Sequence, residues 1–332
     1  MIVVNSYLIA IILLVISMLC WGSWANTQKM ASKKWEFQLF YWDYALGLVL
    51  LSLIFGLTLG SWGSLGRGFI EDLQQASYAA LGSAFVGGVI FNIANLLVVA
   101  AIDLAGMAIA FPIAIGLALV LGVIINYLGE TTGNPYLLFG GVALVALAII
   151  LNALAYKRMS SAKNTSSNKG IFISILAGII MSFFYRFVAD SLTGDFVNPQ
   201  VGMLTPYSAV FVFSIGVFIS NFLWNTIFMY KPISGSAVSY AQYFKDGDFR
   251  LHAIGILGGV IWCLGMSLSI LSSDVASPAI SYGLSQGATL VAALWGVFIW
   301  KEFKQAPAGT NRLIMAMFVF FALGLTLIIL AR

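Results

Sequence analysis

Charged residues are scarce in this sequence. Its 332 residues include only 12 acidic and 16 basic side chains, or 8% of the chain, whereas 61% of the residues are hydrophobic. Soluble globular proteins carry about 25% charged residues, so this composition excludes a water-soluble domain. We therefore expect the chain to lie in a lipid bilayer, which is its first predicted partner.

Reactive side chains are also few. The single histidine is His252, and the two cysteines, Cys20 and Cys263, both fall inside apolar runs. Neither cysteine has a second ligand at metal-binding spacing, and no Ser-His-Asp or Cys-His set can be assembled. The sequence thus predicts no enzyme activity, no catalytic residue, no cofactor and no metal site.

Long apolar runs fill most of the chain. Continuous runs such as Ile9 to Cys20 and Ala316 to Leu330 favour helices over the alternating pattern of a membrane β-barrel. A helix needs about 20 apolar residues to cross a bilayer, and ten such spans fit the chain length. The expected spans lie near residues 7–28, 40–60, 79–102, 105–127, 136–156, 170–188, 207–230, 253–271, 278–300 and 313–330.

A polar stretch from Lys157 to Gly170 divides the chain almost in half. We predict a first five-helix repeat at residues 1–156, a polar linker at 157–169 and a second five-helix repeat at 170–332. The linker lacks a GxxxxGK[ST] phosphate-binding loop, so we predict no nucleotide site there.

The two halves also match in sequence. When residues 102–130 are laid on residues 273–301, Asp103 aligns with Asp274 and Gly116 aligns with Gly287. Because each half has an odd number of spans, two homologous halves would enter the membrane in opposite directions. The predicted fold is therefore an all-α membrane protein, with ten transmembrane helices in a 5+5 inverted repeat.

Basic residues gather in one set of predicted loops. Of the 16 basic residues, only Arg67, Arg186 and Arg332 fall toward the side that carries the chain termini. Basic loops stay in the cytoplasm, so we expect a multi-pass protein of the cell (inner) membrane with both termini non-cytoplasmic. The basic residues form no patch interleaved with aromatic side chains, and we predict no nucleic-acid partner.

Several short motifs carry a family resemblance. The run from Gly87 to Glu130 holds an Asn-bearing third span, a Pro-Ile-x-x-Gly element and a terminal Gly-Glu. A Leu-Ser-Gln element lies in the run from Ser281 to Glu302, and the first two spans hold CWGSWANTQK and LFYWDY. Together these motifs resemble the drug/metabolite transporter superfamily, and within it the glucose/ribose porter and ureide permease families.

The resemblance implies a secondary active transporter that imports a small neutral polar solute. It favours a monosaccharide driven by H⁺ or Na⁺ symport through alternating access, in a monomer or homodimer. The alternatives are a ureide or nucleobase permease, a metabolite exporter and a passive facilitator. Drug exporters of the superfamily usually carry a Glu in the first span, and this chain lacks one. A channel should show a continuous polar face along its pore, and the sequence shows no such face.

Neutral polar and aromatic side chains inside the spans are the candidate solute-binding residues. Such groups suit a solute with hydroxyl, amide and apolar ring surfaces. The alternative role of the amides is hydrogen bonding between helices. The candidates are Trp21, Trp24, Asn26, Asn92, Asn95, Arg186, Asn221, Trp224, Asn225 and Gln286.

Ionisable residues near the spans are the candidates for coupling to an ion. Arg186 is expected inside the sixth span, where it would pair with Asp190, hold a solute carbonyl or reach outward to the interface. Asp43 is expected in the first turn of the second span, either as a structural partner of Lys34 or as a protonation switch. His252 is expected in a solvated loop.

Four residues are the predicted hinges. Pro112 and Gly116 in the fourth span correspond to Gly283 and Gly287 in the ninth. Paired interruptions of this kind are typical of a binding site or hinge near the bilayer midplane. The alternative is close helix packing through small residues.

Overall fold

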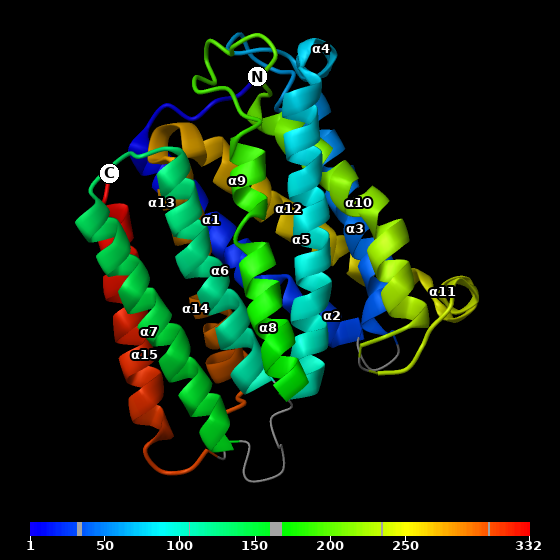
Figure 1. Ribbon diagram of the computed structural model, residues 1–332, viewed down its shortest axis with the longest axis vertical. Helices are drawn as coiled ribbons and strands as arrows, with labels where there is room; N and C mark the ends of the chain where they lie inside the picture. Colours follow the sequence, from blue (N-terminus) through cyan, green and yellow to red (C-terminus); the bar gives the residue numbers. More distant parts are fainter. Residues whose placement is uncertain (32–34, 106, 160–167, 234, 305) are drawn as a thin grey trace.

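The computed structural model describes residues 1–31, 35–105, 107–159, 168–233, 235–304 and 306–332. Within these ranges, ten helices are long and apolar enough to cross a membrane. Figure 1 shows them as one bundle in which both chain ends lie at the same end. We call this the terminus end and the other the basic end. The chain is a multi-pass membrane protein.

The first five spans agree with the predicted helices to within a few residues. A short helix, α4, Phe69–Gln75, lies between the second and third spans. The spans are α1, Tyr7–Ser23, continued by α2, Ala25–Ala31; α3, Phe37–Leu57; α5, Tyr78–Ala105; α6, Met107–Gly129; and α7, Pro135–Met159.

The second five spans include two broken helices. Short helix α11, Tyr240–Asp246, precedes the eighth span. The spans are α8, Asn168–Met181, with α9, Phe184–Ala189; α10, Pro206–Tyr230; α12, Phe249–Ala276; α13, Pro278–Ser285, with α14, Ala288–Leu294, and a π-helix, Trp295–Ile299; and α15, Thr310–Ile329. Residues 160–167 of the predicted linker lie outside the described residues.

Glycines let two pairs of helices approach closely. Gly88 on α5 lies against the carbonyl oxygen of Phe213 on α10, and Gly259 on α12 lies against the carbonyl oxygen of Tyr44 on α3. A Cβ at either glycine would collide with the facing backbone. Such small-residue contacts drive helix association in lipid. They make α5 with α10, and α3 with α12, the central packed pairs.

The predicted hinge positions behave differently in the two halves. Pro112 lies inside α6, and Gly116 follows it within the same uninterrupted helix. The expected interruption of the fourth span is therefore wrong. In the ninth span the helix does break, between α13 and α14 at Gln286-Gly287, and Gly283 lies within α13. A hinge role for the four residues stays a prediction.

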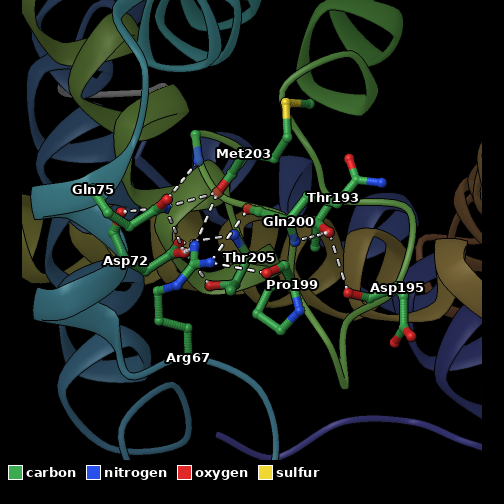
Figure 2. A network of polar contacts seen from close by, with 10 residues as sticks. Arg67, Asp72, Gln75, Thr193, Asp195, Pro199, Gln200, Met203 and Thr205 are labelled. Atoms are coloured by element: carbon green, nitrogen blue, oxygen red, sulfur yellow. Dashed lines mark hydrogen bonds and ion pairs between the residues drawn. The ribbon is translucent and has the colours of Figure 1, made fainter.

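A polar network closes the terminus end. Arg67, in the loop before α4, donates to Asp72 Oδ1 at 2.9 Å and to the Pro199 carbonyl at 2.9 Å. Figure 2 shows the Arg67 side chain reaching toward the segment that precedes α10. The ion pair is shielded from solvent, since the Arg67 and Asp72 side chains are 10% and 0% exposed. The bond from Arg67 to the Pro199 carbonyl joins a loop of the first half to a loop of the second.

Asp72 satisfies a second set of donors in the same network. The backbone N–H and the hydroxyl of Thr205 donate to Asp72 Oδ2 at 2.8 and 3.0 Å. Gln75 adds a parallel link, because it donates to the Met203 carbonyl at 3.0 Å and accepts from the Gly202 N–H at 2.6 Å. The carboxylate of Asp72 is thus the shared acceptor that holds the two loops together.

Replacing Asp72 with alanine should destabilise the protein more than any neighbouring change. Asp72→Ala leaves the Arg67 charge without its carboxylate and both Thr205 donors unpaired, and breaking a buried ion pair costs about 3 kcal/mol. Thermal unfolding of the purified protein in detergent measures the loss. The control is Glu71→Ala, since Glu71 is exposed and should change the stability by less than about 0.5 kcal/mol. Equal stability of the two variants would contradict this role for Asp72.

Candidate functional site

Buried asparagines lie on the packed helices α5 and α10. Asn92 on α5 is 0% exposed, and its Nδ2 donates to the Val217 carbonyl at 3.1 Å and to Ser220 Oγ at 2.8 Å. Val217, Asn221 and Asn225 lie one turn apart on α10 and therefore share a helix face. Asn225 Nδ2 donates to the Gln38 carbonyl at 2.8 Å, where α3 begins. This face of α10 thus looks toward both α5 and α3.

Tyrosines of α3 extend the polar surface. Asn95 Nδ2 donates to the Tyr41 hydroxyl at 3.2 Å. The Tyr41 ring stacks on Tyr44 at 5.1 Å, and Tyr44 lies 4.9 Å from the Trp24 ring. We call Asn92, Asn95, Asn221 and Asn225, with Tyr41 and Tyr44, the amide cluster. Its amides lie beside an aromatic platform, which is the combination that the sequence predicts for a binding site.

Several polar atoms of the amide cluster have no hydrogen-bond partner among the described residues. They are Asn92 Oδ1, both amide atoms of Asn221, Asn225 Oδ1 and the Tyr44 hydroxyl. Leaving such a buried group unpaired costs about 1–3 kcal/mol. Amides that only joined helices would bond to one another or to backbone. Buried polar atoms of this kind are candidates for a hydrogen bond to water or to a ligand.

A small cavity lies beside the amide cluster on the side of the basic end. Its volume is about 50 Å³. Gln38, whose carbonyl accepts from Asn225, lines it together with Leu96, which follows Asn95 in the chain. A water molecule occupies about 30 Å³ in the liquid, so the cavity has room for water and none for an organic ring.

A second site lies at the basic end, around Asp43. The sequence places Asp43 in the first turn of its helix, but α3 begins at Phe37, so Asp43 lies in the second turn. The residue is 1% exposed. The Tyr243 hydroxyl donates to Asp43 Oδ1 at 2.6 Å, and His252 Nδ1 lies 3.0 Å from both carboxylate oxygens. The suggested partner Lys34 lies outside the described residues.

The sequence analysis expects His252 in a solvated loop, and this expectation is wrong. Because α12 begins at Phe249, His252 falls in its first turn and faces α3. Trp35 packs edge-on against the imidazole with ring centroids 5.4 Å apart. Burial raises the pKa of the Tyr243 hydroxyl, and its hydrogen bond to the Asp43 carboxylate raises the pKa further. Tyr243 therefore stays protonated and donates to Asp43.

Four other predicted residues lie outside the amide cluster. Trp21 stacks on Trp262 at 5.4 Å, and its indole N–H donates to the Trp262 carbonyl. The oxygen of Asn26 accepts from the Trp300 indole at 2.7 Å. Gln286 lies at the break between α13 and α14. Trp224 neighbours Asn225 on α10, and its indole N–H has no partner in the described part of the chain.

Arg186 forms the predicted pair with Asp190 at the terminus end. Gly129, the last residue of α6, lies directly beneath the Arg186 guanidinium, and any side chain there would collide with it. Burial raises the pKa of the adjacent Glu130, while Arg186 opposes the shift. The terminal Gly-Glu motif thus contacts Arg186, far along the bundle from the amide cluster.

The described residues include no group of three or more His, Cys, Asp and Glu side chains placed to hold a metal ion. The Asp43 site in particular combines one carboxylate, one imidazole and one phenol. Each of these three groups can carry a proton.

Sequence comparison identifies relatives along almost the whole chain. The sequence model of one family, described as ureide permease, matches residues 40–169 and 153–331. Ureide permease 1 of Arabidopsis thaliana is 23% identical over 96% of this chain and 96% of its own length. The probable ureide permease A3 of Vigna unguiculata is 22% identical over 87% and 94%.

Two further comparisons are more distant. The probable glucose uptake protein GlcU of Staphylococcus aureus is 26% identical, over 61% of this chain and 62% of its own length. A solved crystal structure superimposes with a TM-score of 0.57 at 16% sequence identity, and covers 97% of both chains. That likeness shows a shared fold.

Replacing Asn221 with leucine should stabilise the ligand-free protein. Both amide atoms of Asn221 lack partners, so an apolar side chain of similar size removes an unpaired polar group worth about 1 kcal/mol or more. Thermal unfolding of the purified protein measures the gain. The matched control is Asn225→Leu, one turn later, which also removes the hydrogen bond to the Gln38 carbonyl and should lower the stability. A loss of stability in Asn221→Leu would show that Asn221 serves packing.

Proposed function

Because the chain belongs to the ureide permease family, we propose that it carries a small solute with the N–H and C=O groups of a ureide or nucleobase. The solute binds at the amide cluster between α3, α5 and α10. The observation that supports this role is the set of buried, unpaired amide atoms at Asn92, Asn221 and Asn225. Membrane transport agrees with the ten spans and with relatives named permeases.

The chemistry of the unpaired atoms favours a ureide. Three of them are carbonyl oxygens, on Asn92, Asn221 and Asn225, and these only accept hydrogen bonds. Ureides and nucleobases present N–H groups that only donate, on a flat ring that suits the aromatic platform of Tyr41, Tyr44 and Trp24. A site built around such groups rejects a solute that leaves them unpaired.

A monosaccharide is the second candidate. It is the solute that the sequence motifs favour, and the relative named a probable glucose uptake protein supports it. Sugar hydroxyls both donate and accept, so they also satisfy the amides of the cluster. The ureide takes precedence because the relatives that match this chain over most of its length are named ureide permeases.

Asp43 and His252 are the proposed ion-coupling pair. Asp43 lies on α3 between the cluster residues Tyr41 and Tyr44, so one helix carries both the solute site and the titratable site. A carboxylate that shares a hydrogen bond with an imidazole takes up a proton more readily than a sodium ion, which prefers oxygen ligands. The proposed driving ion is therefore H⁺ rather than Na⁺.

The packing of the glycines supports an inverted repeat and alternating access. Gly88 against Phe213 has its counterpart in Gly259 against Tyr44, with Gly88 and Gly259 separated by the same 171 positions that align the two halves. Each contact joins one helix of the first half to one of the second. Rocking of the halves about these contacts would expose the amide cluster to each side in turn. The basic end faces the cytoplasm in this proposal.

Uptake of a labelled cyclic ureide into proteoliposomes tests the function. The protein should accumulate the ureide under an inward proton gradient, and excess nucleobase should compete better than excess monosaccharide. Asn92→Ala and Asn95→Ala should each lower uptake about tenfold, the equivalent of losing one buried hydrogen bond of ~1.4 kcal/mol.

Asn26→Ala is the control for this experiment, because Asn26 bonds to Trp300 outside the amide cluster. It should leave uptake within about twofold of the unchanged protein. Accumulation of the monosaccharide without the ureide would replace the first candidate by the second. Normal ureide uptake by both cluster variants would remove the amide cluster from the binding site.

A further inference from the structure

A groove on the outer surface of the bundle lies between the end of the ninth span and α15. Its volume is about 820 Å³. One wall is a stripe of α15 that runs from Asn311 through Met315 to Ala322. These positions span about 16 Å at 1.5 Å per residue, which matches the ~15 Å hydrocarbon depth of one bilayer leaflet. The groove has the length of an acyl chain in one leaflet.

Two departures from regular helix create the head of the groove. The ninth span ends in a π-helix, Trp295–Ile299, and Lys301 follows with a positive φ of 53°. A π-helix is rare, and a left-handed conformation is uncommon outside glycine; both concentrate at functional positions. In this segment Phe298 is 61% exposed, and Lys301 and Lys304 lie on the groove lining.

The charges at the head of the groove are unbalanced. Lys301 and Lys304 are exposed, and neither pairs with an acidic side chain in the described parts of the chain. The nearest acid in sequence, Glu302, is already engaged, because it accepts from Lys29 at 2.8 Å and from the Tyr156 hydroxyl at 2.6 Å. Two ammonium groups therefore lie at one end of the apolar groove.

We propose that this groove binds an anionic phospholipid, with its phosphate between Lys301 and Lys304 and one acyl chain along the α15 stripe. The Asn311 side chain, beside the lysines on the lining, offers a further hydrogen bond to the headgroup. The apolar lining of the groove favours a ligand with an acyl chain over a free phosphate. The two lysines favour an anionic headgroup over a neutral lipid.

The charges also disfavour a second copy of the chain as the occupant. A two-fold dimer in a membrane brings the same patch of both copies together at the same depth. Pairing through this groove would place the lysine pair of one copy opposite the lysine pair of the other, and like charges repel. An anionic lipid removes that repulsion by supplying the missing negative charge.

Photo-crosslinking tests the proposal on the whole protein in neutral detergent. The probe is phosphatidylglycerol with a diazirine in one acyl chain, and phosphatidylcholine with the same chains is the comparison. Phosphatidylglycerol should label peptides within residues 297–322 at concentrations at which phosphatidylcholine does not. Since one lysine near a lipid surface contributes about 1 kcal/mol, or fivefold in affinity, Lys301→Gln with Lys304→Gln should weaken labelling about 25-fold.

Lys231→Gln is the matched control, since Lys231 is an exposed lysine that follows α10 at the same end of the bundle. It should leave the labelling unchanged. Val319→Trp fills the groove without altering charge and should abolish labelling at these peptides. This variant tests the proposal if the lysine variants fail to fold.

Four results would overturn the proposal. Equal labelling by both lipids, or a phosphatidylglycerol preference that survives the double lysine change, would show that the lysines do not select the lipid. Full competition by glycerol phosphate would show a site for a free anion. Loss of a concentration-dependent dimer in Val319→Trp, without any lipid labelling in the unchanged protein, would assign the groove to a second copy.

Discussion

The buried carboxylate of Asp43 is the constraint on which much of this structure depends. An unpaired charge inside a membrane span is costly, yet Asp43 is only 1% exposed. The Tyr243 hydroxyl and the His252 imidazole stabilise the carboxylate at 2.6 and 3.0 Å. To supply these two groups, α11 must pack beside α3, and the first turn of α12 must face it. In the proposed mechanism, taking up a proton at this pair removes the charge that holds the arrangement together, and the basic end is then the part of the bundle that responds to the ion.

The position of α3 explains how such control would reach a solute. α3 packs on α12, where Gly259 meets the Tyr44 carbonyl, and on α10, where Asn225 meets the Gln38 carbonyl. A shift of α3 therefore changes both the Asp43 pair and the amide cluster. At the terminus end, the loops of the two halves are joined through Arg67 and Asp72 (Figure 2). The described structure is thus closed at that end, and its small cavity lies toward the basic end.

Hydropathy predicts the ten spans because lipid demands long apolar helices. The four-residue spacing between Arg186 and Asp190 also predicts their ion pair from the sequence alone. Contacts between helices are harder to predict from the sequence. Asn26 and Asn92 are both amides in or near apolar runs, yet Asn26 bonds to Trp300 and Asn92 bonds to α10. The assignment of His252 to a loop fails because α12 begins earlier than its charged first turn suggests. No local sequence pattern indicates that His252 contacts Asp43, because the two residues are 209 positions apart in the chain.

The most direct test of this account measures coupling in proteoliposomes that carry Asp43→Asn. The amide keeps the size of the side chain and mimics its protonated form. Solute should no longer accumulate against its gradient under an imposed pH gradient, while exchange of labelled solute across the membrane should continue. An imposed sodium gradient should drive accumulation in neither protein. Normal proton-driven accumulation by the asparagine variant would contradict the account, since Asp43 would then be structural and the coupling site would lie elsewhere.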